Sequence, residues 1–442
     1  MSPPGPSPEA PLSHRRILKI AAPIVLSNAT VPLLGLVDTG TVGQLGAAAP
    51  IGAVGVGAVI LSALYWVFGF LRMGTTGLVA QAAGEADAAE VSAGLWRALI
   101  VAFLAAMALI ALQGPLFWAA FRLAPASPEV EALARDYLTI RIWGAPATIS
   151  LYAFTGWLIA VERTRAVLAL QLVMNGMNVA LDLWFVLGLG LGVKGVAVAT
   201  LLSEISGLAL AFWLARAALR PGAMRLATLL DRARLGQMAR VNTDIMIRSV
   251  ALQGAFTAFT FLGAGQGDRT LAANQILLQF LSITAYALDG FAFAAESLVG
   301  QAVGARAPAR ARRAAIATSQ WGAGGALLLA ALFALAGPAI IDAMTPAPEI
   351  RDTARLYLPW LVAAPVIGVA SWMFDGIFIG ATLTREMRNT MLASVALYAA
   401  LAAALIPLFG NHGLWAALMG LNIARAATMA ALYPRAEAKA RR

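Results

Sequence analysis

The chain has 442 residues, of which 60% are hydrophobic and only 12% are charged. That balance excludes a soluble globular domain and predicts an all-α membrane protein with many spans. The net charge of +10 does not indicate nucleic-acid binding, because the Lys and Arg residues lie in short breaks between apolar runs and not on one soluble module.

The apolar runs predict twelve membrane-spanning helices, each of roughly 20 residues or more. Basic residues gather in alternate loops, a bias that places both chain termini on the cytoplasmic side. We therefore expect a multi-pass protein of a bacterial inner membrane, with residues 1–16 as a disordered cytoplasmic tail before an uncleaved first span. The predicted spans are 17–43, 50–80, 94–115, 132–160, 166–188, 193–216, 240–263, 270–302, 314–336, 352–380, 389–408 and 413–433.

The first predicted span carries a carboxylate, Asp38, near the end of its apolar run. A charge at membrane depth is kept only where it pairs, meets water or functions, so Asp38 is a functional candidate. Pro23, Pro32 and Gly35 weaken the hydrogen-bond ladder of the same helix. A bent helix with an acid near the bend is typical of transporters.

The fifth predicted span carries a polar stripe of four residues. The spacings between them of 4, 3 and 4 place all four on one helix face, which lipid cannot cover. For Asp182 a functional role is favoured, because burying a carboxylate costs much more free energy than burying an amide. For Gln171 and Asn175 the alternative is hydrogen bonding that holds neighbouring helices together. The stripe consists of Gln171, Asn175, Asn178 and Asp182.

Hydroxyl groups from the sixth and first spans would complete a small polar chamber with Asp38. Thr200 lies in the sixth span, and Thr39 and Thr41 are alternatives in the first. Glu204, also in the sixth span, is expected to pair with a neighbour.

The second half of the chain has its own ionisable residues. Asp289 and Glu296 lie seven residues apart on one face of the eighth span, and Glu296 is interpreted as either a gate or a structural residue. Asp375, in the tenth span, is either functional or a buried, hydrogen-bonded acid. Arg72 and Arg248 are expected to be snorkelling or paired structural residues.

The two halves repeat at an offset of 220 residues. LVAQAAG at 78–84 matches LVGQAVG at 298–304, and Thr164-Arg165 matches Thr384-Arg385. Each half holds six spans, an even number, so the halves form a parallel repeat about an axis along the membrane normal, with the substrate path between them. The expected domains are an N-terminal six-helix lobe at 17–216, a cytoplasmic linker at 217–239, a C-terminal six-helix lobe at 240–433 and a basic cytoplasmic tail at 434–442.

Enzymatic functions find no support in the sequence. It has no GxxxxGK[ST] loop and no GxSxG elbow, and its two histidines are not spaced as metal ligands. The glycines of GLGLGVKG at 188–195 have no strand before them and are interpreted as a turn between two spans. The absence of cysteine excludes disulfides and thiolate metal sites. We predict a protein that is not an enzyme and has no cofactor and no metal centre.

Five stretches resemble the multidrug and toxic compound extrusion (MATE) transporters, and within that family the DinF branch. They are VDTGTVGQLG at 37–46, NVALDLWFVLGLGLGVKGVAVAT at 178–200, AANQILLQF at 272–280, LDGFAFAAESLVGQAVGA at 288–305 and DGIFIGATLTREMRN at 375–389. The resemblance implies twelve helices in two six-helix lobes around a central cleft. It also implies export of organic, often cationic or amphipathic compounds, driven by inward movement of H+ or Na+.

The resemblance also implies positions for the coupling site. Other branches of the family rely on acids in the C-terminal lobe, of which only Asp375 has an approximate counterpart here. In this branch the cation site lies in the N-terminal lobe, and the matching residues are Asp38, Asn178, Asp182 and Thr200. The candidate substrate-cleft or gating residues are Gln44, Gln171, Asn175, Asp289, Glu296 and Asp375.

Coupling to H+ is favoured over Na+, because two carboxylates in one low-dielectric chamber resist being ionised together, although Asp, Asn and Thr oxygens are also good Na+ ligands. The main alternative function is a lipid or glycolipid flippase of the same superfamily. A flippase for a pyrophosphate-linked lipid needs several basic residues inside its cleft, and the mid-span candidates are few: Arg72, Arg248, and Arg141 or Arg425. The expected partners are small organic substrates and the lipid bilayer, with no nucleic acid, and we expect the chain to act as a monomer.

Overall fold

The computed structural model of the chain describes residues 12–30, 37, 40–41, 43–44, 48–123, 126–216, 218 and 226–441. Within these ranges every regular element is a helix, which confirms the all-α prediction. Much of the first predicted span, Asp38 included, lies outside the described residues, as do residues 1–11 of the predicted N-terminal tail.

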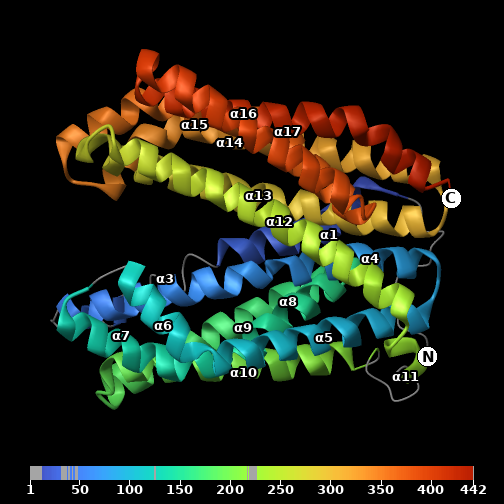
Figure 1. Ribbon diagram of the computed structural model, residues 1–442, viewed down its shortest axis with the longest axis horizontal. Helices are drawn as coiled ribbons and strands as arrows, with labels where there is room; N and C mark the ends of the chain where they lie inside the picture. The colour runs from blue at the N-terminus through green and yellow to red at the C-terminus, as the bar shows by residue number, and fades with distance from the viewer. Residues whose placement is uncertain are drawn as a thin grey trace. The chain divides into compact units, whose positions relative to one another are not determined.

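Eleven helical stretches in the described part of the chain are long and apolar enough to cross a membrane, and they match the second to the twelfth predicted spans in order (Figure 1). The first predicted span is represented by α1 (His14–Ala29). The other elements are α3 (Ala48–Trp66), η1 (Val67–Gly69), α4 (Phe70–Gly84), α5 (Ala88–Ala111), α6 (Gln113–Leu123), α7 (Pro128–Arg141), η2 (Ile142–Gly144), α8 (Ala145–Ala160), α9 (Thr164–Asp182), η3 (Leu183–Gly188), α10 (Gly192–Ala215), α11 (Leu226–Leu229), α12 (Arg232–Ala264), α13 (Asp268–Gly304), α14 (Pro308–Met344), α15 (Pro348–Gly380), α16 (Thr384–Phe409) and α17 (Asn411–Lys439).

Several helices extend beyond their apolar runs, and at three of them a polar side chain caps the first turn. The side chain of Asp87 accepts a hydrogen bond of 2.9 Å from the backbone N–H of Glu90 and so caps the start of α5. At α7, Ser127 caps the first turn and Pro128 occupies the first helical position. At the other end of the chain, α17 continues to Lys439 through the stretch predicted as a basic tail.

The predicted linker at 217–239 is partly helical. It contains α11, and α12 begins at Arg232, eight residues before the predicted span. Asp231 caps α12 by accepting hydrogen bonds of 2.8 and 3.1 Å from the backbone N–H groups of Ala233 and Arg234. These two bonds hold the pKa of the Asp231 carboxyl below its usual range, because they favour the ionised form.

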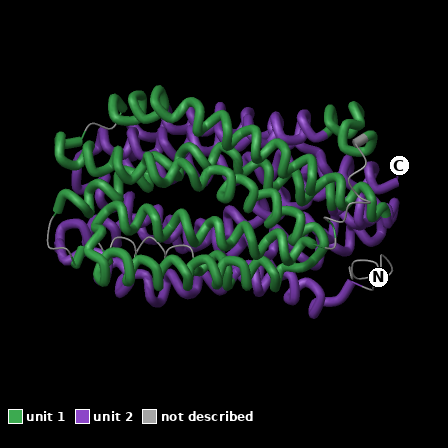
Figure 2. Tube along the Cα trace, turned by 90° about the horizontal axis from the view of Figure 1, so that it is seen from below, with its two compact units in different colours: residues 1–5, 26–79, 87–237 green, residues 6–25, 80–86, 238–442 purple. Residues whose placement is uncertain are grey.

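The chain divides into two compact units (Figure 2). Unit 1 holds residues 1–5, 26–79 and 87–237, and in it α9 packs against α10, α5 against α8 and α3 against α7. Unit 2 holds residues 6–25, 80–86 and 238–442, and in it α13 packs against α14 and α15 while α16 runs beside α17. The core of unit 2 includes edge-to-face ring pairs such as Phe259 with Trp415 and Phe280 with Phe333.

The described backbone carries the 220-residue repeat. Its four non-glycine residues with positive φ form two pairs: Ala86 and Arg306, at 59° and 53°, and Glu162 and Thr382, at 58° and 49°. The members of each pair are 220 residues apart. A left-handed backbone strains any residue with a side chain, so its recurrence at equivalent positions shows that both halves build the same corners between helices.

Two glycines at equivalent positions let helices touch backbone to backbone. A Cβ added to Gly156 would lie 2.3 Å from the carbonyl oxygen of Arg72, and one added to Gly376 would lie 2.3 Å from the carbonyl oxygen of Ala292. The contacted residues are also 220 apart, so each half makes the same close contact. Small residues at helix contacts are how membrane helices pack closely.

Replacing either glycine by Ala should destabilise its unit, because a backbone carbonyl cannot move aside as a flexible side chain can. We expect Gly156→Ala and Gly376→Ala each to cost about 1–3 kcal/mol, the usual range for overpacking. The measurement is the thermal unfolding midpoint of the purified protein in detergent. Gly254→Ala is the matched control, since a Cβ there meets no atom within 4 Å. Equal midpoints for Gly156→Ala and Gly254→Ala would contradict the packing argument.

Candidate functional site

A buried polar cluster joins α9 to α10 within unit 1. The side-chain amide of Asn178 donates a hydrogen bond of 3.1 Å to the hydroxyl oxygen of Thr200, which itself donates to the carbonyl of Val196 at 2.9 Å. Asn178 is fully buried and Thr200 is 5% exposed. Two residues that the family resemblance grouped in one site therefore meet, because neighbouring antiparallel helices bring the end of one span beside the start of the next.

Asp182, the other end of the stripe, is also fully buried. It lies one helical turn after Asn178 on the same face of α9, of which it is the last residue. The chain then continues directly into η3, a π-helical segment. Such widened turns occur frequently at functional sites, because they interrupt the regular ladder and re-aim the side chains beside them. A carboxylate at this position is the most costly residue of the cluster to bury.

The outer part of the stripe connects α9 to the end of α1. Gln171 donates a hydrogen bond of 3.0 Å to the side-chain oxygen of Asn175. Asn175 in turn donates to the hydroxyl of Thr30 at 2.9 Å and to its backbone carbonyl at 3.3 Å. The bonds from Asn175 to Thr30 join two helices, as expected if Gln171 and Asn175 serve to hold neighbouring helices together. The contact also anchors the stretch just before Pro32.

Asp38 and Thr39 lie outside the described residues, so their place relative to this cluster stays a prediction. Two described neighbours in the same segment differ in exposure. Thr41 is buried, and its hydroxyl donates back to the carbonyl of Val37 at 2.8 Å. Gln44 is exposed in a turn.

The second half has no copy of the polar cluster. At an offset of 220 residues, Asn178, Asp182 and Thr200 correspond to Tyr398, Ala402 and Gly420. Tyr398 and Ala402 belong to the apolar core of unit 2. The repeat preserves the helices and their glycine contacts but changes the chemistry at this point, so unit 1 alone carries this set of groups.

The acids predicted in the second half occupy different surroundings. Asp289 is half-buried and Glu296 is 1% exposed, both on α13. Asp375 on α15 forms buried ion pairs with Arg248 of α12 and with Arg425 of α17, the latter at 2.6 Å. This finding confirms the expectation that Arg248 is a paired residue. Asp375 is therefore a buried acid bound by two guanidinium groups, as the hydrogen-bonded alternative predicted.

A second buried ion pair lies in unit 1. Arg141 and Glu204 form a bidentate pair with distances of 2.7 and 2.9 Å. Glu204 is paired, but the expected neighbour in the sixth span is wrong: its partner is Arg141 of α7, 63 residues earlier in the chain. Gly144 leaves room for the pair, because a Cβ there would lie 2.4 Å from the Glu204 carboxylate. The Tyr65 hydroxyl donates to the backbone carbonyl of Arg141 at 3.2 Å.

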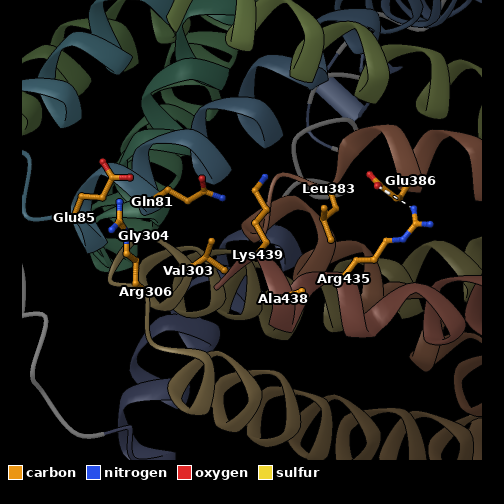
Figure 3. A pocket seen from close by; sticks show the side chains of 10 residues that line it. All are labelled: Gln81, Glu85, Val303, Gly304, Arg306, Leu383, Glu386, Arg435, Ala438 and Lys439. Atoms are coloured by element: carbon orange, nitrogen blue, oxygen red, sulfur yellow. Dashed lines mark hydrogen bonds and ion pairs between the residues drawn. The ribbon is translucent and has the colours of Figure 1, made fainter. Parts of the chain in front are cut away.

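A pocket of about 600 Å³ lies in unit 2, where the ends of α4, α13, α16 and α17 meet (Figure 3). Its wall holds Arg306, and Arg435 pairs with Glu386 at 3.3 Å. The strained turn at Thr382 is held nearby, because Lys439 and Gln81 both donate hydrogen bonds to its side-chain oxygen, at 2.5 and 3.1 Å. These basic residues belong to the loops that the arginine count predicts to be cytoplasmic. The pocket shares no residue with the polar cluster of α9 and α10.

No group of three or more His, Cys, Asp or Glu side chains that could hold a metal ion occurs among the described residues. The neutral and anionic oxygens of the α9–α10 cluster are ligands that suit a proton or a hard monovalent cation. This set of donors is chemically suited to exchange of a small cation at a buried carboxylate.

Comparison with known proteins agrees with this chemistry. A family model described as MatE matches residues 23–184 and 245–405. The chain is 39% identical over 426 residues to DNA damage-inducible protein F of Escherichia coli (strain K12), across 96% of this chain and 92% of that protein. It is 28% identical over 447 residues to the probable multidrug resistance protein NorM of Rhizobium meliloti (strain 1021), across 95% of this chain and 92% of that protein.

The fold is that of solved MATE structures. A crystal structure described as MATE in the bent conformation superposes with a TM-score of 0.87 at 19% identity, covering 98% of this chain and 96% of that one. Family model, relative and fold all span most of the sequence. The chain therefore belongs to the MatE family, whose members are transporters and not enzymes.

Proposed function

We propose that the protein is a secondary antiporter that exports organic, often cationic or amphipathic compounds in exchange for H+. The observation that carries the proposal is the fully buried Asp182 beside the Asn178–Thr200 hydrogen bond. A carboxylate in such a place is costly unless its ionisation is used, and binding and release of a proton is the use that a transporter has for it. The relatives named as multidrug resistance proteins support the substrate class.

The hydrogen bonding of Thr200 favours a proton over Na+. Its hydroxyl oxygen accepts from Asn178 while its proton is donated to the carbonyl of Val196. A Na+ ion would have to bind the one remaining lone pair of this oxygen, whereas a proton on Asp182 requires no change at Thr200. Asp38 is proposed as the second carboxylate, and repulsion between two acids in one chamber favours a state in which one holds a proton.

The transport cycle is proposed to follow from that charge change. When both carboxylates are ionised, they repel each other and need hydration, so an open chamber is favoured. Protonation of one carboxylate removes the repulsion and the need for hydration. Pro23 inside α1 and the Asn175–Thr30 contact at its end make this helix the element that can respond. A relative in fold has been captured in a bent conformation, which supports the same kind of movement here. Rocking of the two six-helix lobes would then expose the substrate path to alternate sides.

The flippase alternative is not favoured by the mid-span cations. Arg141 is fully balanced by Glu204, and Arg248 and Arg425 share the charge of Asp375. A pyrophosphate-linked lipid needs several uncompensated basic residues, and three of the four mid-span candidates together supply only one net positive charge once their acidic partners are counted. This balance leaves a drug-like compound as the better substrate.

Uptake of an ethidium-like dye into everted membrane vesicles tests the proposal. Vesicles that contain the protein should accumulate the dye when a proton gradient is imposed. This accumulation should stop when the gradient is collapsed. Vesicles without the protein are the control for passive entry. Equal uptake with and without the gradient, in vesicles shown to contain the protein, would contradict the antiporter function.

A further inference from the structure

The cluster of Arg248, Asp375 and Arg425 in unit 2 is unbalanced in charge. Arg248 and Arg425 are 6% and 3% exposed, and Asp375 is 8% exposed. Both arginines lie on helices long and apolar enough to span a membrane. Two guanidinium groups therefore face one carboxylate in a place from which water is largely removed, and an excess charge there is costly unless something compensates it.

The geometry concentrates that excess charge. Nη2 of Arg248 and Nη2 of Arg425 both donate to the same oxygen of Asp375, Oδ2, so the two cations converge on one atom. The other carboxylate oxygen, Oδ1, and the Nε atoms of both arginines are buried and have no hydrogen-bond partner among the described residues. Arg425 makes one further bond, of 3.2 Å, to the side chain of Asn422.

The neighbouring acid on α12 does not cancel the charge of these three residues. The nearest acid along α12 is Asp244, one turn before Arg248. It is already used, because it accepts from Arg388 at 2.6 Å and from the hydroxyl of Thr384 at 3.1 Å. Adding this pair to the cluster gives three arginines and two aspartates, and one positive charge still remains.

The ion pair of Arg141 with Glu204 shows which feature distinguishes a ligand site from a structural ion pair. Nε of Arg141 also lacks a partner, so an unpartnered Nε alone does not mark a ligand site. The pair of Arg141 with Glu204 is nevertheless balanced, one cation to one anion, and both carboxylate oxygens are bonded. Of these two clusters, the one formed by Arg248, Asp375 and Arg425 combines unpartnered donors with more cations than anions.

We propose that Arg248 and Arg425 form a binding site for one small monovalent anion, either a halide or an organic carboxylate. Two guanidinium groups offer the N–H donors that such an anion prefers, and a single negative charge makes the cluster neutral. A water or hydroxyl proton that arrives with the anion would satisfy Oδ1 of Asp375. The site lies apart in the sequence from the proposed coupling residues, and it does not depend on the proposed direction or ion of transport.

The test measures the thermal unfolding midpoint of the purified protein in detergent against anion concentration. Sodium chloride forms one arm, sodium acetate another, and the sodium salt of a bulky sulfonate keeps ionic strength constant. The midpoint should rise with chloride or acetate and then saturate, as expected for a ligand that binds only the folded state. A response to chloride alone identifies the halide, and a response to acetate identifies the carboxylate.

Two substitutions should move this response in opposite directions. Arg248→Gln leaves a balanced pair of Asp375 with Arg425, so it should fold and weaken anion binding by about tenfold or more, as expected for a lost charge-assisted hydrogen bond. Asp375→Asn leaves two cations, so its midpoint should lie below wild type in the sulfonate and rise further in the binding anion. Arg385→Gln, the same change at an exposed arginine, is the control and should respond as wild type does.

The proposal is overturned if the wild-type midpoint responds to chloride and acetate no more than to the sulfonate. It is also overturned if Arg248→Gln keeps the wild-type response, because the effect would then arise elsewhere on the protein. Neither result bears on the antiporter function, since the measurement involves no transport.

Discussion

Asp182→Asn should abolish gradient-driven export while leaving the protein folded and inserted, and Asp38→Asn should do the same. Asn keeps the size and much of the hydrogen-bonding ability of Asp but cannot carry a transferable proton. Because Asp182 is fully buried next to Asn178, the amide should be easier to bury than the acid. Substrate binding is expected to survive, since binding and coupling are separable free energies. The measurement is export from reconstituted liposomes, normalised to the amount of folded protein.

Asp375→Asn is the comparison for this experiment, because it removes an acid from the other half of the chain. It should reduce export less per folded molecule, since Asp375 is bound by Arg248 and Arg425 and lies outside the proposed coupling cluster. Near-normal export by both unit 1 variants, with loss only in Asp375→Asn, would place the coupling site in the second half.

Glu204→Gln should destabilise the protein by about 3–5 kcal/mol, the usual cost of leaving one member of a buried ion pair uncompensated. Both side chains are largely buried, with 8% of Arg141 and 11% of Glu204 exposed, so Arg141 would remain as a charge without its partner. The change is measured as the free energy of unfolding in detergent, from denaturant titration of the purified protein.

Two controls separate the lost pair from a general effect of the substitution. Glu131→Gln removes the acid of an exposed pair with Arg135, and it should cost no more than about 1 kcal/mol. The double change Arg141→Leu with Glu204→Leu removes both charges and should recover much of the loss, since apolar residues often replace a buried pair without cost. Equal stabilities for Glu204→Gln and Glu131→Gln would refute the structural importance of the pair.

Sequence patterns were sufficient to predict features that depend on residues close together in the sequence. Apolar length identified the spans, because a helix in lipid must bury all of its backbone polar groups within itself. The ends of the helices were less accurate, since capping groups such as Asp87 and Asp231 start helices outside the apolar segment. The stripe on α9 followed from the 3.6-residue period of the helix, and Asn178 does meet Thr200.

Contacts between distant helices could not be predicted in the same way. Nothing in the sequence joins Asn175 to Thr30, Arg141 to Glu204 or Asp375 to its two arginines, because helix packing decides which buried charges meet. The repeat could have offered a signal, since equivalent positions are expected to share contacts. The repeat did not predict the contacts of the charged residues, because the two halves share a backbone arrangement but carry different polar groups.

The most direct test of the account is export from liposomes under two gradients imposed separately. The liposomes contain the purified wild-type protein or the Asp182→Asn variant, and a dye substrate reports transport. The account predicts that a proton gradient drives export by the wild type in the absence of Na+, that a sodium gradient alone does not, and that Asp182→Asn is inactive under both. Export driven by a sodium gradient alone, or undiminished proton-driven export by Asp182→Asn, would contradict it.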